Sequence, residues 1–237
     1  MKFTVSVACS SCGFKFDTPG YGEQEFPPAK CPRCLEQIHI IDPLTISIVA
    51  ERLLLRGQRE LDEGDFTLSI ICSAMAVECA LTHLFLKWKG LDHFGLTGQS
   101  STELQRQAWE RDYRKETSGG GFEKSANFVS EFLTGKKYDE IATDLLRRSN
   151  EEELAEIGFS HDERHVNVIH RELFMKRNRI VHWGDVSYDT NDASNGLTAA
   201  RAAISVLRLM DREKYSEMER QWRLSIGNSA SSEQVAE

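Results

Sequence analysis

Residues 66–89 read FTLSIICSAMAVECALTHLFLKWK, the longest apolar run of the chain. Apolar side chains occur almost all the way round a helix drawn through it, which is typical of a helix that other helices surround. Gly64 breaks the helical pattern before the stretch, and Asp65 can cap its first turn. The stretch therefore predicts the central helix of a helical domain.

Glu78 is the exception within this stretch, because it places a carboxylate between Val77 and Cys79. A buried carboxylate is costly unless it is paired or faces a polar cavity. Arg177 and Arg179, on a later predicted helix, are the partners that we propose for it. A structural ion pair is a better interpretation of Glu78 than a catalytic acid.

The prolines divide the chain into two architectures. Because proline is excluded from helix interiors, we predict a mainly α protein, with a small β-rich module at 1–42 and a helical domain at 43–224. Within the helical domain, 91–159 is predicted to be an insertion, and 225–237 is predicted to be a disordered tail. All five prolines lie in the first 43 residues, at Pro19, Pro27, Pro28, Pro32 and Pro43.

Two Cys-x-x-Cys pairs mark the N-terminal module: Cys9 with Cys12, and Cys31 with Cys34. Their spacing matches a four-thiolate zinc site. Since residues 2–7 also alternate as a strand does, the module resembles a zinc ribbon whose structural zinc supplies much of the folding free energy. Iron is the chemical alternative, and a disulfide pair fits a reducing compartment less well. Such a ribbon can be purely structural, can dock a partner protein, or can touch nucleic acid.

The charge and hydropathy of the chain limit the classes of function that it can have. The formal net charge of −8 argues against a general nucleic-acid-binding surface. Residues 1–10 lack the pattern of a signal peptide, and no stretch approaches a membrane span in length and apolarity, so we expect a cytoplasmic protein without membrane contact. Residues 164–182 nevertheless hold five basic residues against one acidic residue. This strip suits a phosphate backbone, or it is a solvated face matched by acidic neighbours such as Glu151 to Glu153.

A second helical pattern contains the candidate site. We expect this helix to begin at Ser160, with Glu163 as its capping-box partner, and to end at Gly184. Arg177 falls within its apolar stripe, where a charge must be paired or face a polar cleft. The stripe itself consists of Val166, Ile169, Leu173 and Ile180.

His182 lies five residues after Arg177, about 140° further round an ideal helix. One straight helix in one subunit therefore does not bring the two side chains together, whereas Asn178 and His182 share a face. A site that uses Arg177 with His182 needs the helix to end near Gly184, or needs a second copy of the helix. The simpler interpretation is an arginine paired with an acidic residue and a histidine near a helix end.

The segment Gly64-Asp65-Phe66 leading into Glu78, followed much later by Arg177-Asn178-x3-His182, resembles the HEPN superfamily. The resemblance covers about 44–224. It implies a helical bundle that is often a metal-independent ribonuclease, whose signature is an arginine, usually followed by a polar residue, and then a histidine after four to six intervening residues. Members controlled by an antitoxin carry a tyrosine two residues after the histidine. Gly184 stands there, so that control is not expected.

The resemblance implies a homodimer in which both copies of the motif line one cleft and act on RNA. His182 would be the general base or acid on the ribose 2′-OH and the leaving oxygen. Arg177 would stabilise charge on phosphorus, and Asn178 would orient the phosphate or His182. Glu78 and Arg179 would support them. The product would be a 2′,3′-cyclic phosphate, with no catalytic metal and with the zinc remote from the chemistry.

A defence or toxin role follows from the family association and not from these residues. The alternative function is a non-catalytic helical dimer that binds nucleic acid, a nucleotide or a protein partner, the latter through the zinc ribbon. Metal-independent cleavage of RNA distinguishes the two.

Overall fold

The computed structural model describes residues 2–8, 15–21, 29–30, 32–34, 37–38, 47–98, 101–148 and 163–233. The chain divides into two compact units, Met1–Thr45 and Ile46–Glu237. Each unit is described by itself.

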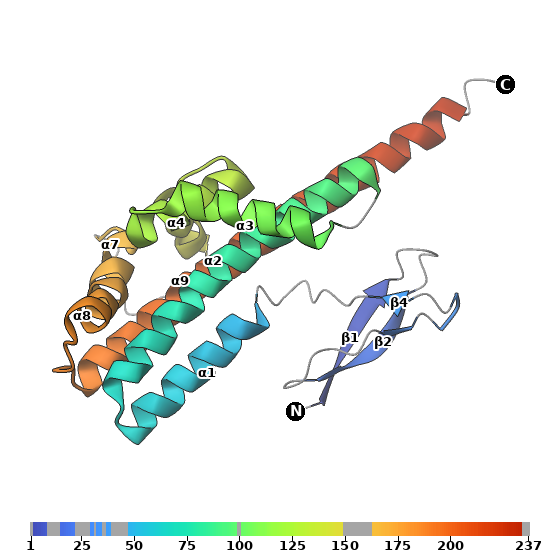
Figure 1. The fold of residues 1–237 in the computed structure, drawn as a ribbon. Coiled ribbons are helices and arrows are strands. Elements are labelled where there is room, and N and C mark those ends of the chain that lie inside the picture. The colour runs from blue at the N-terminus through green and yellow to red at the C-terminus, as the bar shows by residue number, and fades with distance from the viewer. Residues whose placement is uncertain are drawn as a thin grey trace. The chain divides into compact units, whose positions relative to one another are not determined.

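Two antiparallel strand pairs are described in the N-terminal unit (Figure 1): β1 (Lys2–Ala8) with β2 (Lys15–Tyr21), and β3 (Ala29–Lys30) with β4 (Gln37–Ile38). Ala8 pairs with Lys15, and Lys30 pairs with Gln37. Each Cys-x-x-Cys sequence therefore falls between the two paired ends of one hairpin.

The second unit is a helical bundle, which confirms the mainly α class. Its described elements are α1 (Ile48–Glu63), α2 (Phe66–Thr97), α3 (Glu103–Thr117), α4 (Gly121–Thr134), α5 (Tyr138–Arg148), α7 (His165–Ile169), the π-helical segment η1 (His170–Phe174), α8 (Met175–Trp183) and α9 (Thr190–Glu233).

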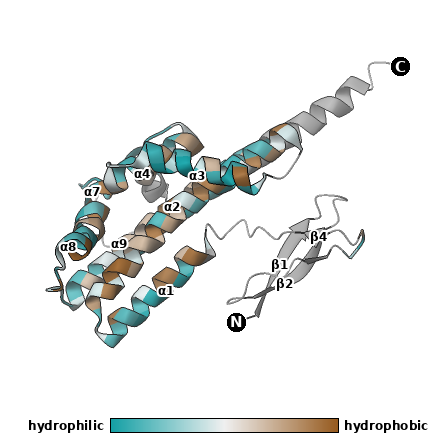
Figure 2. Ribbon diagram, in the orientation of Figure 1, coloured by the Kyte–Doolittle hydropathy of each residue, from teal (hydrophilic) through white to brown (hydrophobic). Residues whose placement is uncertain are grey.

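Helix α2 is the central helix, as its apolar pattern predicts. It contacts α1, α3, α4, α8 and α9, and hydrophobic residues run along much of its length (Figure 2). Its start is capped by Asp65, whose carboxylate accepts the backbone N–H of Leu68 at 2.9 Å. It ends at Gly98, whose φ of 67° is a left-handed conformation that favours glycine.

The expectation that no stretch approaches a membrane span needs correction. Over the described residues, α2 is long and apolar enough to cross a membrane by length and composition alone. In the structure, 61 % of its most apolar 18-residue window is buried inside the bundle. The core helix of a helical bundle and a membrane span share this composition, because both are surrounded by apolar groups.

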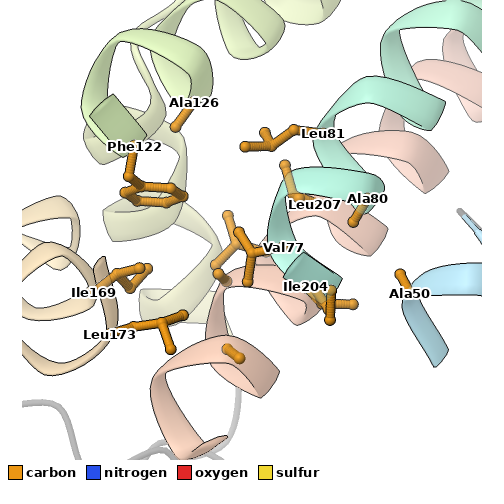
Figure 3. Packing of buried hydrophobic residues seen from close by; sticks show 14 of the residues in the cluster. Ala50, Val77, Ala80, Leu81, Phe122, Ala126, Ile169, Leu173, Ile204 and Leu207 are labelled. Atoms are coloured by element: carbon orange, nitrogen blue, oxygen red, sulfur yellow. The ribbon is translucent and has the colours of Figure 1, made fainter. Parts of the chain in front are cut away.

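The described helices within the predicted insertion at 91–159 pack against the core, and the insertion itself stays a prediction. Helix α2 continues through residue 91 to Thr97. Helix α4 then contributes to the same hydrophobic cluster as α2, where Phe122 and Ala126 lie with Val77 and Leu81 (Figure 3). Helix α5 adds the fully buried Tyr138. Helices α3, α4 and α5 are therefore part of the bundle, and α3 and α4 supply side chains to the candidate site.

The start of the predicted motif helix differs from expectation. Ser160 lies outside the described residues, Glu163 is not helical, and α7 begins at His165. Asp139 of α5 caps the helix from another element, since its carboxylate accepts the backbone N–H of Val166 at 3.0 Å. A cap from a distant residue leaves no local sequence pattern.

Helix α9 is longer than expected at both ends. It begins at Thr190, because the Asp189 carboxylate accepts the backbone N–H of Asp192 at 2.9 Å and caps the first turn. It runs to Glu233, so residues 225–233 are helical where we predict a disordered tail. Extending a formed helix needs no new nucleus, which favours continuation through a segment of poor helix formers.

His165 is a buried titratable group between α5 and the rest of the bundle. It is 5 % exposed, and its ring lies 5.6 Å from the ring of Tyr138. Burial lowers the pKa of His165 to about 4, and the charge of Asp139 opposes this only in part. The folded protein therefore holds this imidazole neutral at pH values where an unfolded chain protonates it.

We expect the free energy of unfolding to fall as the pH falls from about 6.5 towards 4, because only the unfolded state takes up the His165 proton in this window. The stabilisation is complete above the unfolded pKa. Its loss amounts to roughly 3 kcal/mol at pH 4 by the usual conversion of a pKa shift. Urea titrations of wild type and of His165→Phe, at several pH values between about 6.5 and 4, measure this loss of unfolding free energy. Equal pH slopes in the two proteins would contradict this assignment.

Candidate functional site

A polar cavity of about 270 Å³ is formed by α2, α3, α4, η1 and α8. Its apolar lining residues are Leu81, Phe122 and Phe174. Charged and polar side chains line the rest, among them Glu78, Tyr113, Ser125, His170, Arg177 and Asn178. Two of the predicted site residues, Arg177 and Asn178, thus meet the supporting residue Glu78 at one place.

Arg177 is held between two acceptors at this cavity. Its Nη2 lies 3.4 Å from Oε1 of Glu78, and its Nη1 donates to Oδ1 of Asn178 at 3.0 Å. The side chains of Arg177 and Glu78 are 28 % and 45 % exposed. An ion pair with this exposure contributes at most about 1 kcal/mol to stability. Its main effect is to orient the guanidinium towards the cavity.

Arg179, the other proposed partner of Glu78, lies elsewhere. It is exposed, and its charge acts on Asp185, where it helps to lower the pKa of that carboxyl after the larger effect of the hydrogen bonds from Ser187. The structure therefore pairs Glu78 with Arg177 and not with Arg179. The two arginines are two positions apart on a helix and so point in different directions.

His170 is a cavity residue that sequence reasoning missed. It begins the π-helical segment η1, a wider turn of the kind that is frequent at functional sites. His170, Phe174 and Arg177 follow at i, i+4 and i+7, and all three line the cavity. That spacing was visible in the sequence and could have identified His170.

Tyr113 brings a phenol to the cavity from α3, and it too was missed. Burial raises the pKa of Tyr113, its hydrogen bonds with Thr82 and Ser125 lower it, and the nearby charge of Glu78 raises it again. The hydroxyl therefore stays protonated at neutral pH. Thr82 in turn donates to the Glu78 carbonyl at 3.0 Å, and Ser125 donates to the Gly121 carbonyl at 3.2 Å.

His182 does not line this cavity. It is exposed near the end of α8, which stops at Gly184 as predicted. Its neighbours Val181 and Trp183 are 53 % and 84 % exposed. The helix therefore separates Arg177 from His182, as the angle of about 140° predicts. Asn178, one turn before His182 on α8, accepts a hydrogen bond from Arg177 and lines the cavity.

The basic strip at 164–182 is largely matched by carboxylates. Arg164 pairs with Asp139 and Glu123, at 2.7 and 2.9 Å. Arg171 pairs with Glu163 and Glu172. Lys176 contacts Glu172 at 3.1 Å and Asp192 at 2.9 Å. This arrangement favours the solvated-face interpretation over an open phosphate-binding strip.

The predicted zinc ligands fall mainly outside the described residues. Cys34 lies exposed in the turn at 32–34, whereas Cys9, Cys12 and Cys31 are not described. Within the described part of the chain, no group of three or more His, Cys, Asp or Glu could hold a metal ion. The zinc site remains a prediction from the sequence.

Comparison with protein-family models, with curated proteins and with solved structures finds no match to this chain. The HEPN resemblance therefore rests on the sequence alone, on Gly64-Asp65-Phe66 leading into Glu78 and on the later motif Arg177-Asn178-x3-His182.

Proposed function

We propose that this chain is a metal-independent endoribonuclease that acts as a homodimer. The observation that carries the proposal is the placement of the motif on α8. Glu78 and Asn178 hold the Arg177 guanidinium at a polar cavity, while His182 is exposed on another face of the same helix. Cationic and acid–base groups are thus both present, but on separate surfaces of one subunit.

A second copy would bring the two groups together. Val181 and Trp183 flank His182 with exposed apolar surface, and burying such surface favours association. In the dimer, His182 of one subunit would face Arg177 of the partner across one cleft. This pairing brings together two side chains that a single α8 holds on different faces.

The reaction follows from these groups. His182 would take the proton of the ribose 2′-OH, whose oxygen attacks phosphorus, and the bond to the 5′-oxygen would break as that oxygen gains a proton. Arg177 would stabilise the charge that develops on the phosphoryl oxygens. The products are a 2′,3′-cyclic phosphate and a 5′-hydroxyl end.

The N-terminal unit would hold a structural zinc ion through Cys9, Cys12, Cys31 and Cys34. The two strand pairs support this, because each Cys-x-x-Cys follows one strand and precedes its partner. Thiolates at two hairpin connections are a suitable donor set for one tetrahedral ion. We assign this zinc to folding of the unit and to no step of RNA cleavage.

One observation favours a second candidate function. Arg177 is already paired within its subunit, and His182 faces away from the cavity. A non-catalytic dimer that binds a nucleotide or nucleic acid at the cavity needs no closer approach of the two side chains.

We expect the wild-type protein to cut labelled single-stranded RNA in the presence of EDTA, because no step of the proposed reaction uses a metal. Treatment of the fragments should reveal 2′,3′-cyclic phosphate ends and 5′-hydroxyl ends. Cleavage that stops in EDTA and returns with Mg²⁺ would contradict the proposed chemistry, and RNA binding without cleavage would favour the second candidate.

A control distinguishes an effect of EDTA on the reaction from an effect on folding of the N-terminal unit. Elemental analysis should find one zinc per chain, and the far-ultraviolet circular dichroism of the EDTA-treated sample should retain the helical signal. Loss of activity and of folded structure on removal of zinc, both restored by Zn²⁺ alone, would show a structural requirement, whereas loss of activity in a protein that stays folded would contradict the metal-independent chemistry.

A further inference from the structure

The cavity beside Arg177 has the size and the lining of a base-binding site. An apolar cavity of about 150 Å³ is enough to hold one benzene ring. At about 270 Å³ this cavity has room for a fused bicyclic ring with substituents. Its apolar lining includes Phe122 and Phe174, whose rings stack at a centroid distance of 5.1 Å.

The charges of the lining disfavour a phosphate as occupant. Among the described lining residues, Arg177 is the sole arginine or lysine, and it is already paired with Glu78. A phosphate within the cavity would meet the negative charge of Glu78, which costs free energy. A neutral ring with both hydrogen-bond donors and acceptors suits this mixed lining better.

The polar lining residues also determine which RNA base fits the cavity best. The Glu78 carboxylate only accepts hydrogen bonds, and its two oxygens can accept from two adjacent N–H groups. On its Watson–Crick edge guanine presents N1–H beside N2–H, and none of the other RNA bases presents two adjacent donors there. Asn178 uses its Oδ1 to accept from Arg177, which leaves its amide hydrogens to donate to an acceptor such as guanine O6.

We infer that this cavity binds a guanine base of the RNA, next to the phosphodiester that the dimer cleaves. The inference rests on the proposed function, because the guanine belongs to the substrate. Arg177 connects the two sites, since it lines the cavity and carries the proposed contact to phosphate. Single-stranded RNA is commonly recognised in this way, by bases turned out of the strand and read on their edges.

The test is the binding of 3′-mononucleotides to the full-length protein by isothermal titration calorimetry. We expect 3′-GMP to bind on the order of tenfold more tightly than 3′-AMP, because two matched hydrogen bonds discriminate against the wrong base by about this factor. Inosine 3′-monophosphate lacks the 2-amino group and should bind with intermediate affinity. Equal affinity for 3′-GMP and 3′-AMP would overturn the inference.

Two variants test whether the preference for 3′-GMP arises at this cavity. Glu78→Gln keeps the shape of a side chain that is 45 % exposed, but its amide has only one acceptor, so the preference for 3′-GMP should fall towards unity. Ser125→Leu fills the cavity from α4 and should weaken every nucleotide. Glu63→Gln, at an exposed end of α1, is the matched control and should leave all affinities unchanged. A preference that survives Glu78→Gln would overturn the assignment.

Sequencing of the cleaved RNA ends distinguishes this inference from the proposed function. Cleavage without enrichment of guanine beside the cut overturns the guanine site and leaves the nuclease standing. A preference for 3′-GMP in a protein that cuts no RNA supports the cavity as a guanine site and contradicts the nuclease.

Discussion

His182→Ala is expected to lower the rate of RNA cleavage by about 10²- to 10⁴-fold, the usual contribution of a general acid–base group. The variant should fold normally, because His182 is exposed and makes no described contact with the core. RNA affinity should stay close to that of wild type, since Arg177 and the cavity are unchanged. Single-turnover cleavage of labelled RNA, with binding measured separately, gives both quantities.

His83→Ala is the matched control, because His83 is also exposed but lies outside the cavity and the motif.

A pair of variants tests directly whether the two subunits share one site. Arg177→Ala and His182→Ala should each cut RNA far more slowly than wild type, and mixed dimers should regain part of the activity, since one composite site then has both residues. Failure of the mixture to recover, in dimers shown to exchange, would contradict a shared site.

Asp211→Ala should be among the most destabilising single changes in the helical unit. The Asp211 carboxylate accepts from Nζ of Lys87 at 2.7 Å and from Nε1 of Trp88 at 2.8 Å, and so ties α9 to α2. The side chains of Lys87 and Asp211 are 11 % and 3 % exposed. Removing one partner of a buried ion pair typically costs about 3–5 kcal/mol, because the other charge remains buried.

Urea unfolding followed by the helical circular dichroism signal measures this cost. The double change Lys87→Met with Asp211→Leu should recover much of the lost stability, because no unpaired charge is then left inside. Asp92→Ala, at an exposed position of the same bundle, is the control and should change stability by less than about 0.5 kcal/mol. An Asp211→Ala midpoint equal to that of Asp92→Ala would contradict the role of this network.

Features that depend on local pattern were predictable from the sequence. The apolar run at 66–89 predicted the central helix, and Asp65 predicted its cap. Gly184 predicted the end of α8, because a left-handed residue that closes a helix is usually glycine. The spacing from Arg177 to His182 predicted that one helix keeps them apart, because helix geometry alone sets that angle.

Features that depend on distant residues were decided by the tertiary structure. Asp139 caps α7 from another helix, so no nearby residue marks that start. Tyr113 and Ser125 reach the cavity from α3 and α4, which the sequence suggested were an insertion. Glu78 could pair with either arginine on grounds of charge, and only the packing of α2 against α8 selected Arg177. Sequence periodicity describes one helix at a time, whereas a site between helices depends on which faces meet.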